Sequence, residues 1–238
     1  MEVIRTDDKE IAAQRAAKAL SETLQRHERD RVLLLLAGGS WLRVLDQLGS
    51  ESLGENVIIG VTDERFSQDP AVNNFAQLSQ TEFYRRAKEK GVHYINTQVQ
   101  GGETIEELAA RFEKELRGWK EKNPRGRVIV TQGIGLDGHT CGIMPYPEDK
   151  ELFSHLFEDP KKWVVGYDAK EKNEYPLRVT ITLSFLKGIV NHSIVYAVGE
   201  NKKEALERVL AEEGQIAATP ARIIHEMENV QLFSDIAM

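Results

Sequence analysis

Two side chains that could move a proton, Asp137 and His139, lie two positions apart in the segment Gln132–Thr140. The segment directly follows a run of apolar, β-branched residues, Arg127–Thr131, which predicts a buried strand. Its three glycines would let the backbone turn sharply and let a ligand approach. Histidine suits proton transfer near neutral pH, and the carboxyl end of a buried strand is where open α/β sheets bind ligands. These features favour a catalytic site over a turn in which the histidine only caps a helix.

A second candidate site is Gly38-Gly39-Ser40, which lies between the apolar run Val32–Ala37 and a predicted helix, Trp41–Leu48. Glycines expose backbone N–H groups, and a following helix adds its N-terminal dipole, so this segment suits an anion such as phosphate. A tight turn with Ser40 as the helix cap fits the same residues equally well.

A third candidate, Asp63-Glu64-Arg65, follows the predicted strand Val57–Thr62. Arg65 could bind a phosphate through its planar guanidinium, and Asp63 could bind hydroxyls or assist proton transfer. Asn73 and Asn74 come next, and either could cap a helix or reach a ligand. Three charged residues after an apolar run are also typical of a plain solvated turn.

Two further basic residues could add positive charge to such a site. Arg178 opens the predicted strand Arg178–Leu183, and Lys202 opens the predicted helix Lys202–Leu210. The alternatives are an exposed charge at the end of a strand for Arg178, and a solvated helix residue for Lys202.

The composition limits the class of protein. The 238 residues carry a net charge of −7, which argues against general nucleic-acid binding but not against a small anionic ligand. The single cysteine, Cys141, fits a reducing compartment, and no Cys/His cluster has zinc-ligand spacing. Neither a signal peptide nor a membrane-spanning run is recognisable, so we expect a cytoplasmic protein that does not bind membranes.

Predicted helices and strands alternate along the whole chain. That order predicts a mostly parallel sheet with helices on both faces, within one domain that spans residues 1–238. The remaining expected helices are 9–27, 71–90 and 105–122, and the remaining expected strands are 92–95, 163–166, 193–198 and 230–233.

Together these segments resemble the 6-phosphogluconolactonase family, within the wider glucosamine-6-phosphate isomerase/deaminase superfamily. Four blocks match in order: Gly38–Ser40, Asp63–Arg65, Gly133–Thr140 and Arg178–Thr182. The resemblance covers nearly the whole chain. It implies a doubly wound α/β fold of the sugar-phosphate isomerase type.

The resemblance also implies hydrolysis of 6-phospho-D-glucono-1,5-lactone to 6-phosphogluconate, a reaction that needs no metal and no cofactor. His139 would be the general base, with Asp137 and Asp63 as the other expected catalytic residues. The sugar phosphate would be bound by the following residues: Gly38, Gly39, Ser40, Arg65, Asn74, Gly138, Arg178 and Lys202.

Some positions depart from the family. Trp41 and Leu42 replace its usual Thr and Pro, so a hydroxyl is lost beside the phosphate cradle and a bulky ring is added. Cys141-Gly142-Ile143-Met144 replaces its usual Ala-Ser-Leu-Phe. Neither change removes the expected base.

Two other functions fit parts of the pattern. An amino-sugar-phosphate isomerase or deaminase would use Asp63 as its base, but Arg65 stands where those enzymes usually have tyrosine. A non-catalytic sugar-phosphate sensor is favoured only by the altered cradle at Trp41. The oligomeric state cannot be derived from the sequence.

Overall fold

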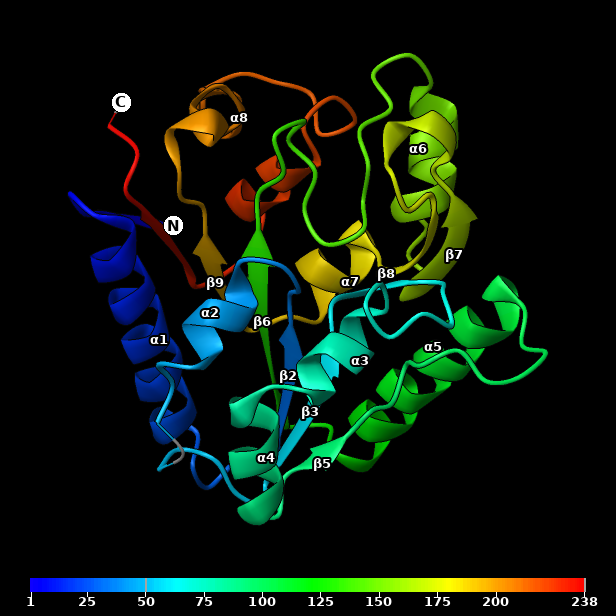
Figure 1. Cartoon of the computed structure of the whole chain (residues 1–238). Helices are drawn as coiled ribbons and strands as arrows, with labels where there is room; N and C mark the ends of the chain where they lie inside the picture. Colours follow the sequence, from blue (N-terminus) through cyan, green and yellow to red (C-terminus); the bar gives the residue numbers. More distant parts are fainter. Residues whose placement is uncertain (50, 238) are drawn as a thin grey trace.

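Seven parallel strands form the central sheet of the computed structural model, which describes residues 1–49 and 51–237 (Figure 1). Every neighbouring pair runs parallel, so the predicted mostly parallel sheet is confirmed. Across the sheet the strands are β1 (Glu2–Arg5), β10 (Val230–Ser234), β9 (His192–Tyr196), β6 (Arg127–Gly133), β2 (Val32–Leu36), β3 (Val57–Val61) and β5 (His93–Tyr94).

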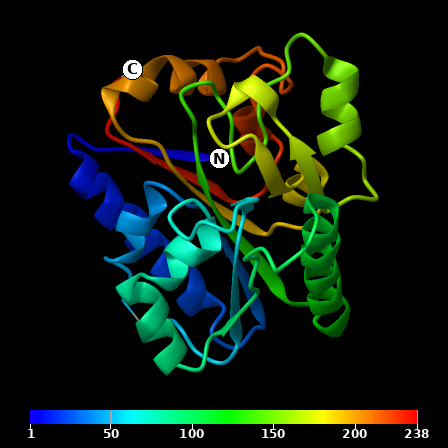
Figure 2. The same ribbon diagram turned by 45° about the vertical axis from the view of Figure 1, so that its right-hand side comes forward.

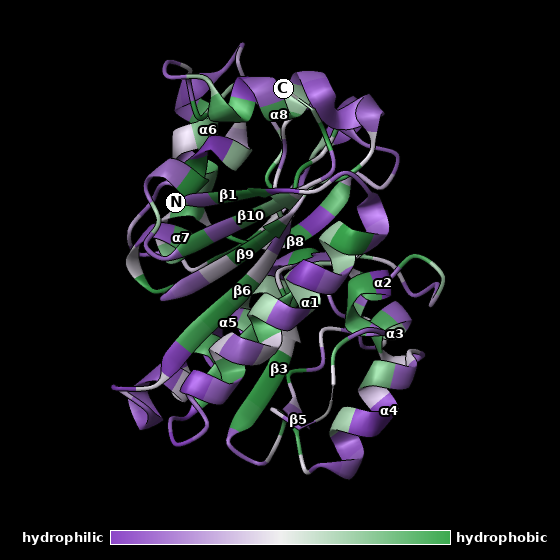
Figure 3. Ribbon diagram, turned by 90° about the vertical axis from the view of Figure 1, so that its left-hand side faces the viewer, coloured by the Kyte–Doolittle hydropathy of each residue, from purple (hydrophilic) through white to green (hydrophobic). Residues whose placement is uncertain are grey.

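Strand β2 shows why helices cover both faces. All five of its residues are buried, and successive side chains of a strand point to opposite faces. Leu33 and Leu35 therefore enter one apolar core, while Val32, Leu34 and Leu36 enter the other. Figure 3 shows the strands mostly in the hydrophobic colour, with α1 lying across them.

The helices divide between these two cores. The core that contains Leu34 is covered by α1 (Lys9–Arg26), α2 (Trp41–Leu45), α3 (Asn74–Ser79) and α4 (Glu82–Glu89). The core that contains Leu35 is covered by α5 (Ile105–Lys122), α6 (Lys150–Phe157), α7 (Leu183–Gly188) and α8 (Lys203–Leu210). Short 3-10 turns occur at η1 (Lys170–Lys172), η2 (Glu200–Lys202) and η3 (Pro220–His225).

A second, antiparallel sheet of three strands was not expected. It consists of β4 (Asp63–Arg65), β8 (Leu177–Ile181) and β7 (Val164–Asp168), with β8 in the middle. The strands predicted near 163 and 178 are therefore real but do not join the parallel sheet. Figures 1 and 2 show this small sheet beside α5.

The charged segment after β3 belongs to this second sheet. Instead of turning into solvent, the chain continues as β4, where Asp63 and Glu64 are both buried. The backbone N–H of Ile181 donates to the carbonyl of Thr62, which joins the two sheets at this point. The alternative of a plain solvated turn is therefore wrong.

The helix expected over residues 71–90 is two helices. Asn73 caps α3 by accepting from the N–H of Ala76, and Thr81 caps α4 by accepting from the N–H of Tyr84. A side-chain cap competes with continued helix, so a second cap inside one apolar pattern ends the first helix. β1, α6 and α7 were not predicted. Within the described ranges, no helix is long and apolar enough to cross a membrane.

Two histidines meet at the amino-terminal edge of the sheet. The Nε2 atoms of His27 and His192 are 3.1 Å apart, and Nδ1 of His27 lies 2.8 Å from a carboxylate oxygen of Asp30. Burial, reinforced by the charges of His27, Arg26 and Arg127, lowers the pKa of His192 from 6.5 to about 4. His192 is therefore neutral in the folded protein at neutral pH.

This lowered pKa predicts a pH dependence of stability. The unfolded chain binds the His192 proton more tightly than the folded chain. The stability that depends on a neutral His192 is therefore fully present above pH 6.5, and it is lost as the pH falls toward 4. We expect His192→Gln to make the melting temperature fall less steeply over that range, measured by calorimetry. The exposed His155→Gln is the control, and equal slopes in all three proteins would contradict the assignment.

Candidate active site

A cavity of about 400 Å³ lies where the order of the parallel strands reverses. After β2 the chain continues to β3 on one side, whereas β6 pairs with β2 on the other side. Loops that leave the carboxyl ends of two such strands diverge and open a crevice, which is the usual ligand site of an open α/β sheet. The loops after β2 and β6 both line this cavity.

Most of the residues expected to form a site line this cavity, although they come from distant parts of the chain. The expected residues in its wall are Gly38, Gly39, Ser40, Asp63, Arg65, Asn74, His139, Arg178 and Lys202. Asp137 and Gly138 are not part of the wall.

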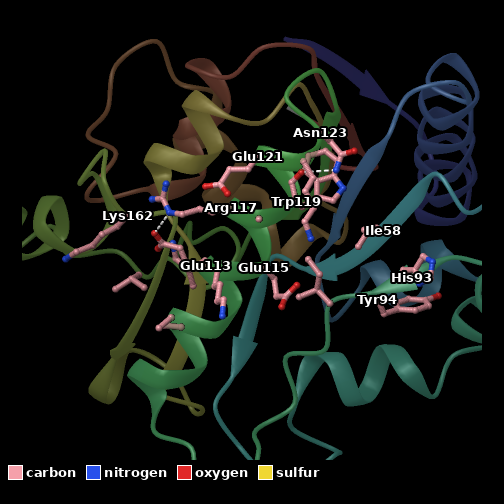
Figure 4. Close-up of a pocket in the computed structure, with 18 of the residues that line it drawn as sticks. Ile58, His93, Tyr94, Glu113, Glu115, Arg117, Trp119, Glu121, Asn123 and Lys162 are labelled. Atoms are coloured by element: carbon pink, nitrogen blue, oxygen red, sulfur yellow. Dashed lines mark hydrogen bonds and ion pairs between the residues drawn. The ribbon is translucent and has the colours of Figure 1, made fainter.

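A larger cavity, of about 1060 Å³, lies between α5 and the edge of the sheet (Figure 4). Two of its charged groups, Glu113 and Arg117, are engaged in hydrogen bonds within the protein. The Glu113 carboxylate accepts hydrogen bonds from Arg117 and from the backbone N–H groups of Trp163 and Val164. None of the expected site residues lines this cavity, so we assign the candidate active site to the smaller one.

The Asp137 carboxylate orients the imidazole of His139 by a hydrogen bond to its Nδ1 atom. Oδ1 of Asp137 lies 2.5 Å from Nδ1 of His139 and also accepts from the backbone N–H of His139 at 3.1 Å. With its proton on Nδ1, the imidazole donates to the carboxylate and keeps Nε2 free to accept a proton. Burial alone would raise the pKa of Asp137, but the hydrogen bond and charge of His139 outweigh burial and lower that pKa. This is the arrangement of an oriented general base.

Gly135 makes room for this pair. A Cβ at residue 135 would lie 2.1 Å from Nδ1 of His139 and 2.6 Å from Oδ1 of Asp137. Gly138, expected at the substrate, instead forms the turn: its φ is +91°, and a Cβ there would lie 2.9 Å from the Thr219 side chain. In the structure, Gly138 therefore lies in the turn and outside the cavity wall.

A buried ion pair links β4 and β8 of the second sheet in the wall of the cavity. Nη1 of Arg178 donates to Oδ2 of Asp63 at 3.1 Å, and both side chains are buried. The remaining N–H groups of Arg178 bind the Asn173 side chain and the Tyr175 carbonyl. The Asn74 amide also donates to Asp63, at its carbonyl and its carboxylate. Asp63 is therefore engaged as an acceptor that holds Arg178 in place.

Two positive charges remain for an anion. Within the part of the chain that the structure describes, neither Arg65 nor Lys202 has a carboxylate within ion-pair distance. Burial lowers the pKa of Lys202. Nε of Arg65 is buried without a partner, and its guanidinium lies 4.8 Å from the Tyr175 ring centre. A charged ligand would satisfy both side chains.

Trp41 does not enter the cavity. Its ring is fully buried, packs edge-on against Tyr196, and donates its indole N–H to the Gln132 carbonyl at 2.8 Å. Ser40, in contrast, lines the cavity, and its side chain makes no cap hydrogen bond to α2. The bulky ring therefore lies beneath the glycine turn and leaves the cavity open.

Several wall residues were not predicted. Asn173, Glu174 and Tyr175 reach the cavity from the loop before β8, and Cys141 lies in its floor. Burial and the nearby Asp63 raise the pKa of the Cys141 thiol to about 12, so it stays protonated. In the sequence, the loop before β8 is distinguished only by its charged residues and prolines, and neither feature points to a ligand. Among the described residues, no group of three or more His, Cys, Asp or Glu could hold a metal ion.

Comparison with known proteins identifies relatives of this chain. Residues 7–233 match the family model described as glucosamine-6-phosphate isomerases/6-phosphogluconolactonase. The 6-phosphogluconolactonase of Homo sapiens is 27% identical over 214 residues, which cover 86% of this chain and 76% of that protein. That of Rattus norvegicus is 26% identical over 226 residues, covering 90% and 80%.

Solved structures agree on the fold. A 6-phosphogluconolactonase from Shewanella baltica superposes with a TM-score of 0.78 at 21% identity, covering 98% of this chain and 96% of the other. One from Trypanosoma brucei gives 0.76 at 20% identity, covering 98% and 95%.

The Gly135 contact leads to a direct test of the Asp–His pair. We expect Gly135→Ala to break the hydrogen bond between Asp137 and His139, because the new methyl group would occupy its space. The downfield Nδ1 proton of His139 should then vanish from the NMR spectrum, and the pKa of Asp137 should rise. Gly118→Ala is the control, since a Cβ there meets nothing within 4 Å. An unchanged Nδ1 signal in Gly135→Ala would contradict the pairing.

Proposed function

Because the chain belongs to the family of glucosamine-6-phosphate isomerases and 6-phosphogluconolactonases, we propose that it hydrolyses 6-phospho-D-glucono-1,5-lactone to 6-phosphogluconate. The curated relatives that match it carry the name 6-phosphogluconolactonase. The substrate would then be a small sugar phosphate, and the reaction a step of the pentose phosphate pathway.

One observation carries the proposal: His139, oriented by Asp137, faces a cavity that also contains two basic side chains, Arg65 and Lys202, for which the described residues offer no carboxylate partner. A lactonase needs a base for water, a donor for the developing oxyanion and a positive site for phosphate. His139 would supply the base, and Arg65 and Lys202 would supply the positive site. Asp63, the base that isomerase chemistry would need, is engaged with Arg178, which favours hydrolysis over isomerisation.

The proposed reaction proceeds in two steps. Nε2 of His139 takes a proton from water as the water oxygen bonds to the lactone carbonyl carbon. The tetrahedral oxyanion then collapses, the bond from that carbon to the ring oxygen breaks, and the imidazolium returns its proton to the ring oxygen. The product carboxylic acid loses its proton to solvent. Asp137 stabilises the imidazolium between the steps.

The phosphate and hydroxyls would be bound by the opposite wall. We propose that Lys202 and Arg65 pair with the phosphate, beside the backbone of Gly38, Gly39 and Ser40. Asp63 would support catalysis by holding Arg178 in the wall of the cavity. An acidic protein can bind an anion here because the local charge of the wall is positive.

His139→Ala tests the base. We expect kcat/KM on freshly made lactone to fall by roughly 10²–10⁴-fold, the usual contribution of general base catalysis. The affinity for 6-phosphogluconate, measured by calorimetry, should change little because the phosphate site remains. The exposed His93→Ala is the matched control. Wild-type rates no faster than spontaneous opening would overturn the proposed function, and joint loss of binding and folding would make His139 structural.

A further inference from the structure

Glu64 is a charged residue that the proposed reaction does not use, yet its side chain is fully buried. Oε1 accepts hydrogen bonds from the backbone N–H groups of Asn74 at 2.5 Å and Arg65 at 2.8 Å. Oε2 accepts from the N–H of Phe75 and from the Thr97 hydroxyl, both at 2.9 Å. All four partners donate, so the contacts suit an ionised carboxylate.

These contacts join three separate segments. They bind β4 to the first residues of α3 and to the segment that contains Thr97. Asn73 caps the same helix by accepting from Ala76, so Glu64 takes the two N–H groups that the cap leaves free. A buried carboxylate at this point fixes where α3 begins, and with it the position of Asn74.

The orientation of the Asn74 amide follows from its neighbours. Its Nδ2 donates to the carbonyl of Asp63 at 2.9 Å and to the Asp63 carboxylate at 3.3 Å. Its Oδ1 must therefore point the other way, toward the turn at Gly38, where it is buried without a donor. Because Asn74 lines the cavity, this oxygen is placed to accept a hydrogen bond from a sugar hydroxyl.

We infer that Glu64 is a positioning residue of the active site: its carboxylate holds the start of α3 so that Asn74 presents Oδ1 to the substrate. The same contacts hold Asp63, and through Asp63 they hold Arg178. The effect that we expect on KM rests on the proposed function, because KM is measured with the substrate of that function. Glu64 itself touches neither the substrate nor the reacting atoms.

The protonation state of Glu64 should control this arrangement. Burial raises the pKa of Glu64 to about 7, although the hydrogen bonds from Phe75, Asn74 and Thr97 oppose it, and Asp63 adds to the rise. The charged groups nearby are Asp63 and Arg65 on β4 and Arg178 on β8; α3 and the Thr97 segment present only N–H and hydroxyl groups. A proton on Oε2 would face the Phe75 N–H and weaken that contact.

Glu64→Gln removes the charge and keeps the size of the side chain. We expect KM to rise roughly fivefold to tenfold, the effect of about one hydrogen bond to the substrate, with a smaller change in kcat. In the wild type, KM should rise as the pH falls through about 7, and this dependence should be absent in Glu64→Gln. Asp149→Asn is the control, because Asp149 caps α6 by accepting from the Leu152 N–H and lies outside the cavity wall.

A merely structural role predicts another result. Glu64→Gln would then lower the melting temperature, as Asp149→Asn does, while KM and its pH dependence stayed as in the wild type. That outcome would overturn the inference.

A measurement on the ligand-free wild type separates this inference from the proposed function and needs no variant to fold. Between pH 5.5 and 8.5, the NMR signals of the Asn74 and Phe75 backbone amides and of the Asn74 side-chain amide should move together with one midpoint. If they do so in a protein that does not hydrolyse the lactone, the proposed function fails and the positioning role stands. If the protein is active and the Asn74 side-chain signal does not move with the backbone signals, the positioning role is wrong.

Discussion

Burial of three charged side chains at the junction of the two sheets is the constraint on which the site depends. Asp63, Glu64 and Arg178 are each almost completely shielded from water. A buried charge is strongly unfavourable unless it is paired and fully hydrogen-bonded. Arg178 and Asp63 neutralise each other, and backbone N–H groups surround Glu64. The partners of these charges therefore cannot move independently, which makes the wall of the cavity rigid before any ligand arrives.

The family resemblance and the parallel sheet could be predicted from the sequence, because local patterns carry both. The apolar runs of β2 and β6 and the helical pattern of α5 are local, and the structure confirms them. The second sheet could not be predicted, because β4 pairs with β8 across more than a hundred residues. Glu64 was overlooked for a related reason: a charged run after a strand is typical of solvent, and only the packing of α3 buries it.

The residues that line the cavity could be predicted better than the contacts they make. The motifs marked His139, Arg178 and Asn74 because residue type and position at strand ends suggest chemistry. Which of two asparagines reaches the cavity depends on where α3 starts, and both the Asn73 cap and the distant Glu64 carboxylate bind that start. Gly138 as a substrate-binding residue stays a prediction: its φ of +91° suits the turn next to His139, and it lies outside the cavity wall.

Trp41, the largest departure from the family pattern, is best understood through the strands that it connects. Its indole N–H binds the Gln132 carbonyl at the end of β6, while the N–H of Ala37, after β2, binds the Thr131 hydroxyl. The Gln132 side chain continues the network, because it donates to Thr140 and accepts from Ser193. The carboxyl ends of β2 and β6 are thus linked to each other and to Ser193 on β9. Because a parallel sheet diverges at a reversal of strand order, these links set the distance between the glycine turn and the loop that carries His139. The Trp41 ring, which lies below the glycine turn, can therefore support that turn in a chain that lacks the family's threonine hydroxyl, and it does so without narrowing the cavity.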